Sequence, residues 1–306
     1  TSNPKEPSLQ KANDKNFADA VLYSYKIAAY TPDSTAVVID VTPIFTTDMK
    51  EFAFLPTTIM GLIQLNSTFN KDGVALGEVK AFDDNLSVKS MLSYKVSLKF
   101  MSFSFLDNMS LTATVTRSLL LLPEEKMRPR ISDSRVGIFI TSKQHVSTEK
   151  DGIQNYTLAN RWRMEPKDMA AFQRGELVEP VKPIVFYIDD AFPELWKQPI
   201  KEGTLRWNAA FEKIGFKNAV QVRDFPKDDP EFDPDNLKYS CIRYLPSSTA
   251  NAMGPSWVDP TTGEIVNASV LVYNDVIRLI NNWRFVQTAQ IDPSVRAKKM
   301  PDDIVK

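Results

Sequence analysis

The sequence has few of the residues from which metal and redox sites are built. Its 306 residues contain one histidine, His145, and one cysteine, Cys241. A structural zinc site needs four nitrogen or sulfur ligands, and many catalytic zinc sites use several histidines, so this pair can form neither kind. A single cysteine also cannot form a disulfide within the chain, and cysteine usage therefore leaves the redox compartment open.

Other shortages exclude further classes of protein. No apolar run approaches the roughly 18 residues of a membrane-spanning helix, and the ten glycines include no phosphate-binding loop motif. The net charge of −1 argues against a partner such as nucleic acid or an anionic membrane. The polar start Thr1–Pro7 lacks the features of a signal peptide. We therefore expect no nucleic-acid partner and no membrane span.

The first part of the chain has the pattern of a β-domain. All five tryptophans lie beyond residue 160, whereas the earlier part alternates apolar and polar residues, as in 92–100 and 111–116. Alternation with period two predicts strands with one face on a core and the other in water. We expect residues 1–19 to be a tail and residues 20–122 a mostly antiparallel β-domain, either a sandwich or a curled sheet. Its first hairpin should join 21–29 to 36–41.

The rest of the chain divides into a connector and an α/β segment. Residues 123–180 are rich in charge, with short strands expected at 136–141 and 160–164. Residues 181–306 should begin with a βαβ unit: a buried strand at 184–188, a helix that begins at Pro199 and ends at Gly215, and a strand at 219–222. A third strand at 241–245, a hairpin of 254–258 with 264–273, and a helix over 275–286 should follow. The predicted fold class is thus α+β.

Several residues could carry chemistry, but each has a structural interpretation that we favour. His145 lies in a polar loop or strand end and has no nucleophile motif beside it, which favours a surface histidine. Cys241 opens an apolar strand and is expected to be a core thiol. Asp189 and Asp190 follow a strand and could bind a cation, yet they are also ordinary turn formers. The acidic run 227–235 lacks the spacing of a calcium loop and is expected to be solvated.

Several longer strings resemble one family. They are Met127–Arg130 leading to Asp133–Phe139, then Asn160–Arg163, Glu179–Asp189, Asn251–Ser256 with Val258–Ile265, and Pro301–Asp303. Together they are similar to large zinc-dependent metalloproteases with metzincin-like catalytic domains, which are common in Bacteroidota. In that family a domain of unknown function precedes the peptidase domain. The resemblance is dense over 124–306 and weaker over 20–122.

The resemblance implies a zinc site that these residues do not contain. In the family, the helix that begins at a string like Pro301–Asp303 continues into H-E-x-x-H, whose histidines bind zinc and whose glutamate acts as general base. The sequence therefore resembles the N-terminal part of such an enzyme, with residues 181–306 as a partial peptidase domain. No catalytic or metal-binding residue is expected in these 306 residues, and zinc is expected as the cofactor of the full-length protein.

Two segments receive a role from the resemblance. Residues Asn251, Ala252, Met253, Gly254, Pro255 and Ser256 would be the edge strand that pairs with a peptide substrate by strand addition; the alternative is a simple hairpin with a bulge. The segment with Asp133 and Arg135 could occupy the cleft in the manner of a propeptide, with Asp133 on the zinc. The alternative, which we favour, is a turn that anchors the connector.

The function expected on this basis is that of the N-terminal portion of a secreted, periplasmic or cell-surface zinc endopeptidase. Its partners would be a peptide or protein substrate and the remainder of its own catalytic domain, and the 306 residues alone should be inactive. The rival hypothesis is a non-catalytic module that binds protein or glycan, with a degenerate peptidase-like half. H-E-x-x-H within about twenty residues after Lys306 in the reading frame would support the peptidase, and a stop codon would support the binding module.

Overall fold

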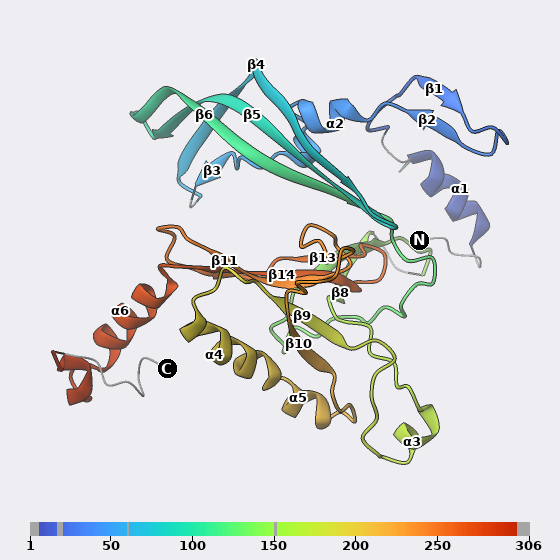
Figure 1. Cartoon of the computed structure of the whole chain (residues 1–306). Coiled ribbons are helices and arrows are strands. Elements are labelled where there is room, and N and C mark those ends of the chain that lie inside the picture. Colours follow the sequence, from blue (N-terminus) through green and yellow to red (C-terminus); the bar gives the residue numbers. More distant parts are fainter. Residues whose placement is uncertain (1–5, 17–20, 60, 150–151, 299–306) are drawn as a thin grey trace. The chain divides into compact units, whose positions relative to one another are not determined.

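A computed structural model describes residues 6–16, 21–59, 61–149 and 152–298. In these ranges the chain is mixed α+β with mostly antiparallel sheets, and it divides into two compact units, Thr1–Leu121 and Leu122–Lys306 (Figure 1). None of the helices in the described ranges has the length and apolar character needed to cross a membrane. The expected helix start at 301–303 lies outside the described residues.

The first unit is built on three long antiparallel strands. Its described elements are α1 (Pro7–Asn16), β1 (Ile27–Tyr30), β2 (Val37–Ile39), α2 (Thr42–Thr46), the 3-10 turn η1 (Lys50–Phe52), β3 (Thr58–Ile59), β4 (Ile63–Ala81), β5 (Asn85–Phe100) and β6 (Phe103–Leu120). The larger sheet has the order β3-β4-β5-β6. Both segments with period-two alternation lie within it, in β5 and β6, so the prediction of strands there is confirmed.

One face of this sheet forms the core of the first unit, as the alternation predicts. Leu92, Tyr94 and Val96 on β5 are buried, and partly buried apolar side chains from β4 and β6 pack around them. The hydroxyl of Tyr94 donates to Asp48 Oδ1 at 3.0 Å. Burial, together with this hydrogen bond to a carboxylate, raises the pKa of Tyr94 to about 12. The apolar core of the described part of the unit is therefore one sheet face, although Ser87 and Ser93 on the other face of β5 are also buried.

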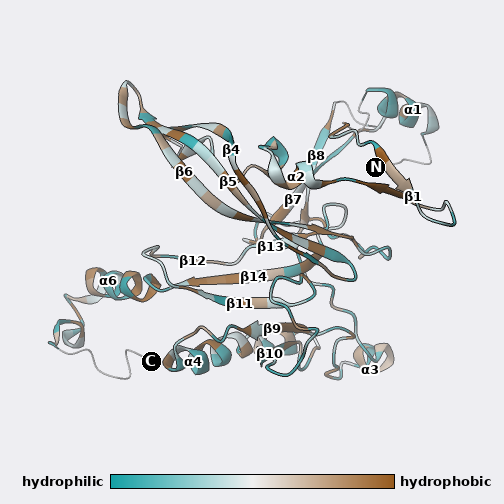
Figure 2. Cartoon of the chain, turned by 45° about the horizontal axis from the view of Figure 1, so that its top comes forward, coloured by the Kyte–Doolittle hydropathy of each residue, from teal (hydrophilic) through white to brown (hydrophobic). Residues whose placement is uncertain are grey.

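The expected first hairpin is present but shorter than predicted. β1 and β2 pair antiparallel, and every residue in both strands is exposed. In Figure 2, β1 is coloured brown, which marks hydrophobic residues. Since this ribbon buries neither of its faces, it is not the second layer of a sandwich, and the described part of the unit is one curled sheet with a separate hairpin.

The second unit contains a mixed sheet and several short elements. They are β7 (Ile140–His145), β8 (Gln154–Ala159), α3 (Met169–Gln173), β9 (Ile184–Ile188), α4 (Glu194–Leu205), α5 (Asn208–Glu212), β10 (Val220–Asp224), β11 (Ser240–Leu245), β12 (Ala252–Met253), β13 (Ser256–Val258), β14 (Ile265–Tyr273), α6 (Val276–Thr288) and the 3-10 turn η2 (Pro293–Arg296). The sheet runs β10-β9-β11-β14-β12, and β13 also pairs with β14.

The predicted βαβ unit and the strands after it are confirmed. β9 pairs in parallel with both β10 and β11, and β11 pairs in parallel with β14. The single helix predicted between these strands is divided into α4 and α5, and α5 ends at Glu212. Gly215 follows it with a φ of +95°, the left-handed conformation that glycine adopts easily. The next residue, Phe216, is buried beside Phe172 and Phe211. The helix predicted over 275–286 is α6.

The structure corrects the predicted helix start and the predicted connector. The helix begins at Glu194, and Pro199 lies inside it. The proline has no N–H to donate to the carbonyl of Leu195, and Leu195 is itself 61% exposed. The connector strands are β7 and β8, shifted from the predicted ranges, and the connector also contains the unpredicted helix α3, whose N-cap Asp168 accepts from the Ala171 amide at 2.9 Å.

Candidate functional site

The segment proposed as a peptide-binding strand lies at one edge of the mixed sheet. Ala252 pairs with Val272 and Met253 with Leu271, and after Gly254 and Pro255 the strand resumes with Ser256 opposite Ala268 and Trp257 opposite Asn267. The two residue numbers in each pair have the same sum, so the register continues without a slip through Gly254 and Pro255. β12 and β13 are therefore one antiparallel edge strand; we call residues 252–257 the open edge.

The register determines which backbone groups of the open edge point away from the sheet. The Ser269 amide donates to the Pro255 carbonyl at 2.9 Å, so Pro255 faces β14. Backbone direction alternates along a strand, and Met253 and Trp257 must face β14 as well. The N–H and C=O groups of Ala252, Gly254 and Ser256 consequently point outward. Pro255 lies at an inward position, where its missing N–H costs one ladder bond but removes no outward donor.

Few groups inside the unit cover the outward side. Residues 251–255 are all exposed, and a Cβ built on Gly254 would meet nothing within 4 Å. The Ala252 amide is occupied by Asn251 Oδ1 at 2.8 Å. In the described part of this unit, the outward groups of Gly254 and Ser256 have no hydrogen-bond partner. They form a short template on which an extended backbone can pair.

The opposite edge of the same sheet is capped at its first position. On β10, the Val220 amide donates to Asn208 Oδ1, and the Asn208 side-chain amide donates to the Val220 carbonyl, each at 2.9 Å. The Asn208 side chain thus takes both outward groups of Val220, as a neighbouring strand would. Lys201 on α4 also pairs with Asp224 at the end of β10 at 2.7 Å. The backbone of Val220 is therefore blocked to strand addition, whereas no side chain occupies the outward groups of Gly254 and Ser256 in the described part of this unit.

A polar clamp holds the connector on the hairpin beside the open edge. Arg163 donates to Glu264 through two parallel hydrogen bonds, Nε to Oε1 and Nη2 to Oε2, both 2.8 Å long. Arg163 Nη2 also reaches the Glu125 carbonyl at 2.6 Å. The side chains of Arg163 and Glu264 are only 21% and 10% exposed. The hydrogen bond to Glu264 raises the pKa of Arg163. This is a bidentate pair in a largely desolvated setting.

A second ion pair belongs to the same clamp. Lys126 Nζ lies 3.0 Å from Asp259 Oδ2, and the side chain of Asp259 is 0% exposed. Asp259 also accepts from the amide and hydroxyl of Thr261 at 2.8 and 2.6 Å, which fixes the turn between β13 and β14. Burial alone would raise the pKa of Asp259, but the hydrogen bonds from Thr261 and the charge of Lys126 outweigh it and lower the pKa.

The lowered pKa of Asp259 predicts a loss of stability in acid. A carboxylate whose pKa is lower in the folded state stabilises the fold above its unfolded value of about 3.8, and this contribution is lost as the pH falls from there toward the folded value. We expect the free energy of unfolding to fall less steeply between pH 5 and pH 3 in Asp259→Asn than in the wild type. Urea unfolding at each pH measures this difference. Equal slopes for the variant and the wild type would contradict the prediction.

Asp133 and Arg135 form a self-contained turn. Arg135 Nε and Nη2 donate to the Asp133 carboxylate at distances of 2.6 to 3.1 Å, and the backbone amides of Arg135 and Val136 donate to Asp133 as well. The side chain of Arg135 is 87% exposed and that of Asp133 is 46% exposed. No hydrogen bond or ion pair among the described residues joins either of them to residues 251–256. These bonds close a local turn, and a cleft-occupying role of the segment stays a prediction.

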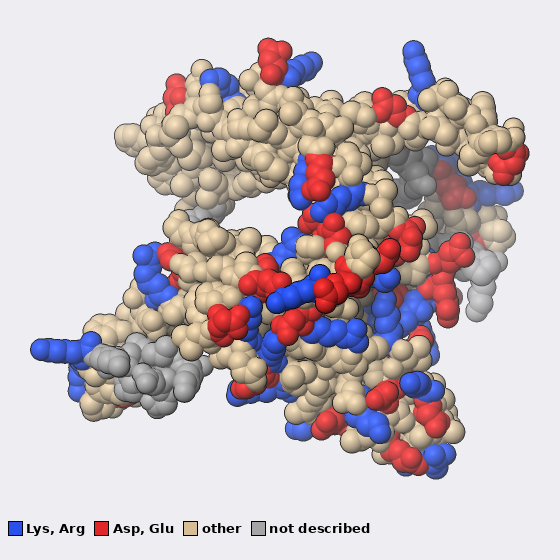
Figure 3. Space-filling view, viewed as in Figure 1, with Lys and Arg blue, Asp and Glu red and all other residues tan. Residues whose placement is uncertain are grey.

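The remaining candidates from the sequence are structural in this fold. Asp189 accepts from the amides of Ala191 at 3.0 Å and Tyr244 at 3.3 Å, so it fixes the end of β9. Cys241 is buried, and burial raises its pKa to about 11, as expected of a core thiol. The acidic run is anchored by Phe232, whose ring lies 4.9 to 5.2 Å from those of Tyr187, Phe225 and Tyr239. On the face in Figure 3, acidic and basic side chains alternate over the second unit.

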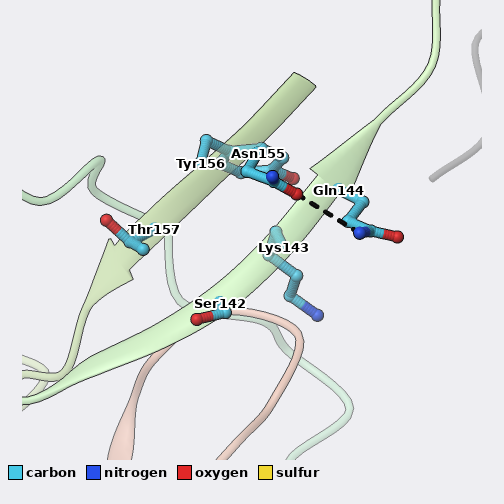
Figure 4. Close-up of a pocket in the computed structure, with 6 residues that line it drawn as sticks. All are labelled: Ser142, Lys143, Gln144, Asn155, Tyr156 and Thr157. Atoms are coloured by element: carbon cyan, nitrogen blue, oxygen red, sulfur yellow. Dashed lines mark hydrogen bonds between the residues drawn. The ribbon is translucent and has the colours of Figure 1, made fainter. Parts of the chain in front are cut away.

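His145 ends β7, next to a polar depression of about 690 Å³ on the β7–β8 hairpin. Figure 4 shows its lining, which consists of Ser142, Lys143, Gln144, Asn155, Tyr156 and Thr157. Gln144 Nε2 donates to Asn155 Oδ1 at 3.2 Å across the hairpin. Lys143 is the one charged residue of this lining, so the depression offers no acid–base pair.

Zinc does not fit the residues that the structure describes. Among them, no three His, Cys, Asp or Glu side chains lie close enough together to hold a metal ion. The carboxylates near the open edge, Asp259 and Glu264, already bind Lys126 and Arg163. A zinc site of the kind that the sequence resemblance implies would have to be built from other residues.

The chain is of mixed α+β class. Its second unit has a sheet of four parallel strands, β10, β9, β11 and β14, and the open edge pairs antiparallel with β14. The chain belongs to a family described as a domain of unknown function (DUF5117), whose profile matches residues 1–167. The match covers the first unit and continues to residue 167 in the second, so it includes Lys126 and Arg163 of the clamp. Neither the curated proteins nor the solved structures include a match to this chain.

Proposed function

We propose that the open edge binds an extended peptide by strand addition, and that the chain is the substrate-binding part of a secreted or periplasmic zinc-dependent peptidase. The observation that carries the proposal is the pair of outward, unpartnered backbone groups at Gly254 and Ser256. Main-chain hydrogen bonds to a sheet edge hold a peptide in an extended conformation, which is the conformation that most peptidases cleave.

The position of the family-like strings supports this proposal. Asn251–Ser256 contains most of the open edge. Val258–Ile265 runs from the last residue of β13 through the turn to the first residue of β14, and Asn160–Arg163 supplies Arg163 to the clamp. Strings that are separated by about a hundred residues along the chain therefore meet at the β13–β14 hairpin, with Arg161 on the side of β14 that faces away from β13. The zinc-binding residues would come from the remainder of the catalytic domain, and we assign this chain the task of holding the substrate in register.

Gly254→Pro is the variant that tests the proposal, because it removes an outward N–H and leaves every bond to β14 in place. We expect kcat/KM for an extended peptide to fall about 10- to 100-fold in the full-length, zinc-loaded protein, as a lost backbone hydrogen bond and a steric block would require. Gly254→Ala keeps the N–H, and its added Cβ meets open space, so it should stay within about threefold of the wild type.

The same pair of variants separates the outcomes. Unchanged cleavage in Gly254→Pro, with unfolding temperature also unchanged, would remove the edge-strand proposal. Peptide binding that depends on Gly254, in a full-length protein that cleaves no peptide when supplied with zinc, would instead identify a non-catalytic binding module.

A further inference from the structure

We infer that the open edge selects peptides that carry apolar side chains at every second residue, an inference that rests on the proposed function. The selectivity comes from the alternation of side chains along the edge strand. Met253, Pro255 and Trp257 lie on one side of the sheet, which we call the apolar face of the edge. Ala252, Gly254 and Ser256 lie on the other side, the small-residue face.

The apolar face presents accessible hydrophobic surface. Met253 is 49% and Trp257 36% exposed, although both are large apolar side chains, and Pro255 between them is also exposed. The Met253 sulfur lies 3.9 Å from the Tyr273 hydroxyl, which extends the same face onto β14. In a peptide strand beside the edge, every second side chain would lie on the apolar face. Those side chains would cover Met253, Pro255 and Trp257, and apolar surface of both partners would be buried.

The small-residue face offers much less contact. Ala252 and Ser256 have short side chains, and around Gly254 a Cβ would meet no atom within 4 Å. Peptide side chains on this side consequently have few atoms to pack against and should tolerate any size or polarity. Selectivity is therefore expected at alternate peptide positions, whichever way the peptide runs.

The backbone and side-chain preferences are coupled. In an antiparallel pair, directly opposite residues have their side chains on the same face. Peptide residues that bond Gly254 and Ser256 would therefore have their side chains on the small-residue face. The residues with side chains on the apolar face would direct their N–H groups away from the protein. If the peptide runs antiparallel to the edge strand, the positions that prefer apolar side chains should tolerate N-methylation. If the peptide runs parallel to it, N-methylation at those same positions should abolish binding.

Two scans of one peptide test the inference. The probe is a fluorescent, acetylated hexapeptide in which leucine alternates with threonine, followed by two lysines for solubility, and its binding to this chain is measured by anisotropy. The first scan N-methylates one residue at a time, and the second replaces each leucine or threonine by serine. We expect N-methylation to abolish binding at alternate residues, and serine to weaken binding about five- to twentyfold at the leucines but less than twofold at the threonines.

Variants of the protein provide the control. Met253→Thr and Trp257→Thr should each reduce the penalty for leucine-to-serine replacement while the N-methylation pattern stays the same. Met169→Thr changes a methionine of similar exposure, 54%, on α3 and should change neither scan. Alternating N-methylation effects without alternating serine effects would overturn this inference and leave strand addition intact. N-methylation without effect at every position would overturn strand addition itself.

Discussion

Gly263→Ala is expected to lower the free energy of unfolding by about 3 kcal/mol or more, from the combined cost of a left-handed non-glycine residue and of overpacking. Gly263 has a φ of +77°, and a Cβ there would lie 2.6 Å from the Ala159 carbonyl oxygen. That oxygen belongs to the backbone of β8 and cannot rotate away, as the end of a flexible side chain would. Urea unfolding followed by fluorescence measures the loss.

Two other glycines separate the causes of this effect. Gly175 has a φ of +83° with no atom within 4 Å of an added Cβ, so Gly175→Ala should show the conformational cost alone, about 1 kcal/mol. Gly254 has open space and no positive φ, and Gly254→Ala should be close to neutral. A loss in Gly263→Ala no larger than that in Gly175→Ala would contradict the close packing of the hairpin turn on residue 159.

Glu264→Gln is expected to cost about 3 kcal/mol, because it removes the close carboxylate of the mostly desolvated Arg163 guanidinium and leaves only the 56% exposed Glu165, 3.9 Å away, as a counter-ion. The carboxylate of Glu264 meets both nitrogens of the guanidinium fork at 2.8 Å, and its side chain is 10% exposed. Equilibrium unfolding of Glu264→Gln, Arg163→Met and the double variant measures the coupling of the two residues. The double variant should recover part of the loss, since replacing both partners of a buried pair removes the unpaired charge.

The chain offers a matched control for this pair. Asp133 and Arg135 have the same two-nitrogen geometry, but their side chains are 46% and 87% exposed. Asp133→Asn should therefore cost less than about 1 kcal/mol, as is usual for surface ion pairs. Equal losses for Asp133→Asn and Glu264→Gln would mean that burial does not set the strength of the clamp.

The local sequence predicts the centre of the second unit well. The continuous apolar run 184–188, the helical stripe and the left-handed Gly215 are each readable within a few residues, and together they define the parallel strands. Cys241 is similarly predictable, because an apolar strand in such a unit is buried. The helix start was missed because Pro199 suits a first turn, whereas Pro193 is the N-cap and Pro199 lies at an exposed part of the helix.

The clamp could not be predicted, because its partners are far apart along the chain. Arg163 and Glu264 are separated by 101 residues, and Lys126 and Asp259 by 133. A strand is predicted over 160–164, and its backbone does approach the start of β14, but only as an isolated bridge of Arg161 with Glu264. Here alternate side chains are fixed by long-range hydrogen bonds and not by a sheet ladder. The helix α3 had a usable signal, Asp168 as an N-cap followed by Met169–Phe172.

The most direct test of the open edge is hydrogen exchange at single amides, measured by NMR with and without the leucine–threonine peptide at saturation. We predict that the amides of Gly254 and Ser256 exchange at least tenfold more slowly in the complex, as expected of groups that gain a backbone partner. The Val220 amide on the opposite edge already donates to Asn208 and should not change. Peptide binding that leaves exchange at Gly254 and Ser256 unchanged would contradict strand addition at this edge.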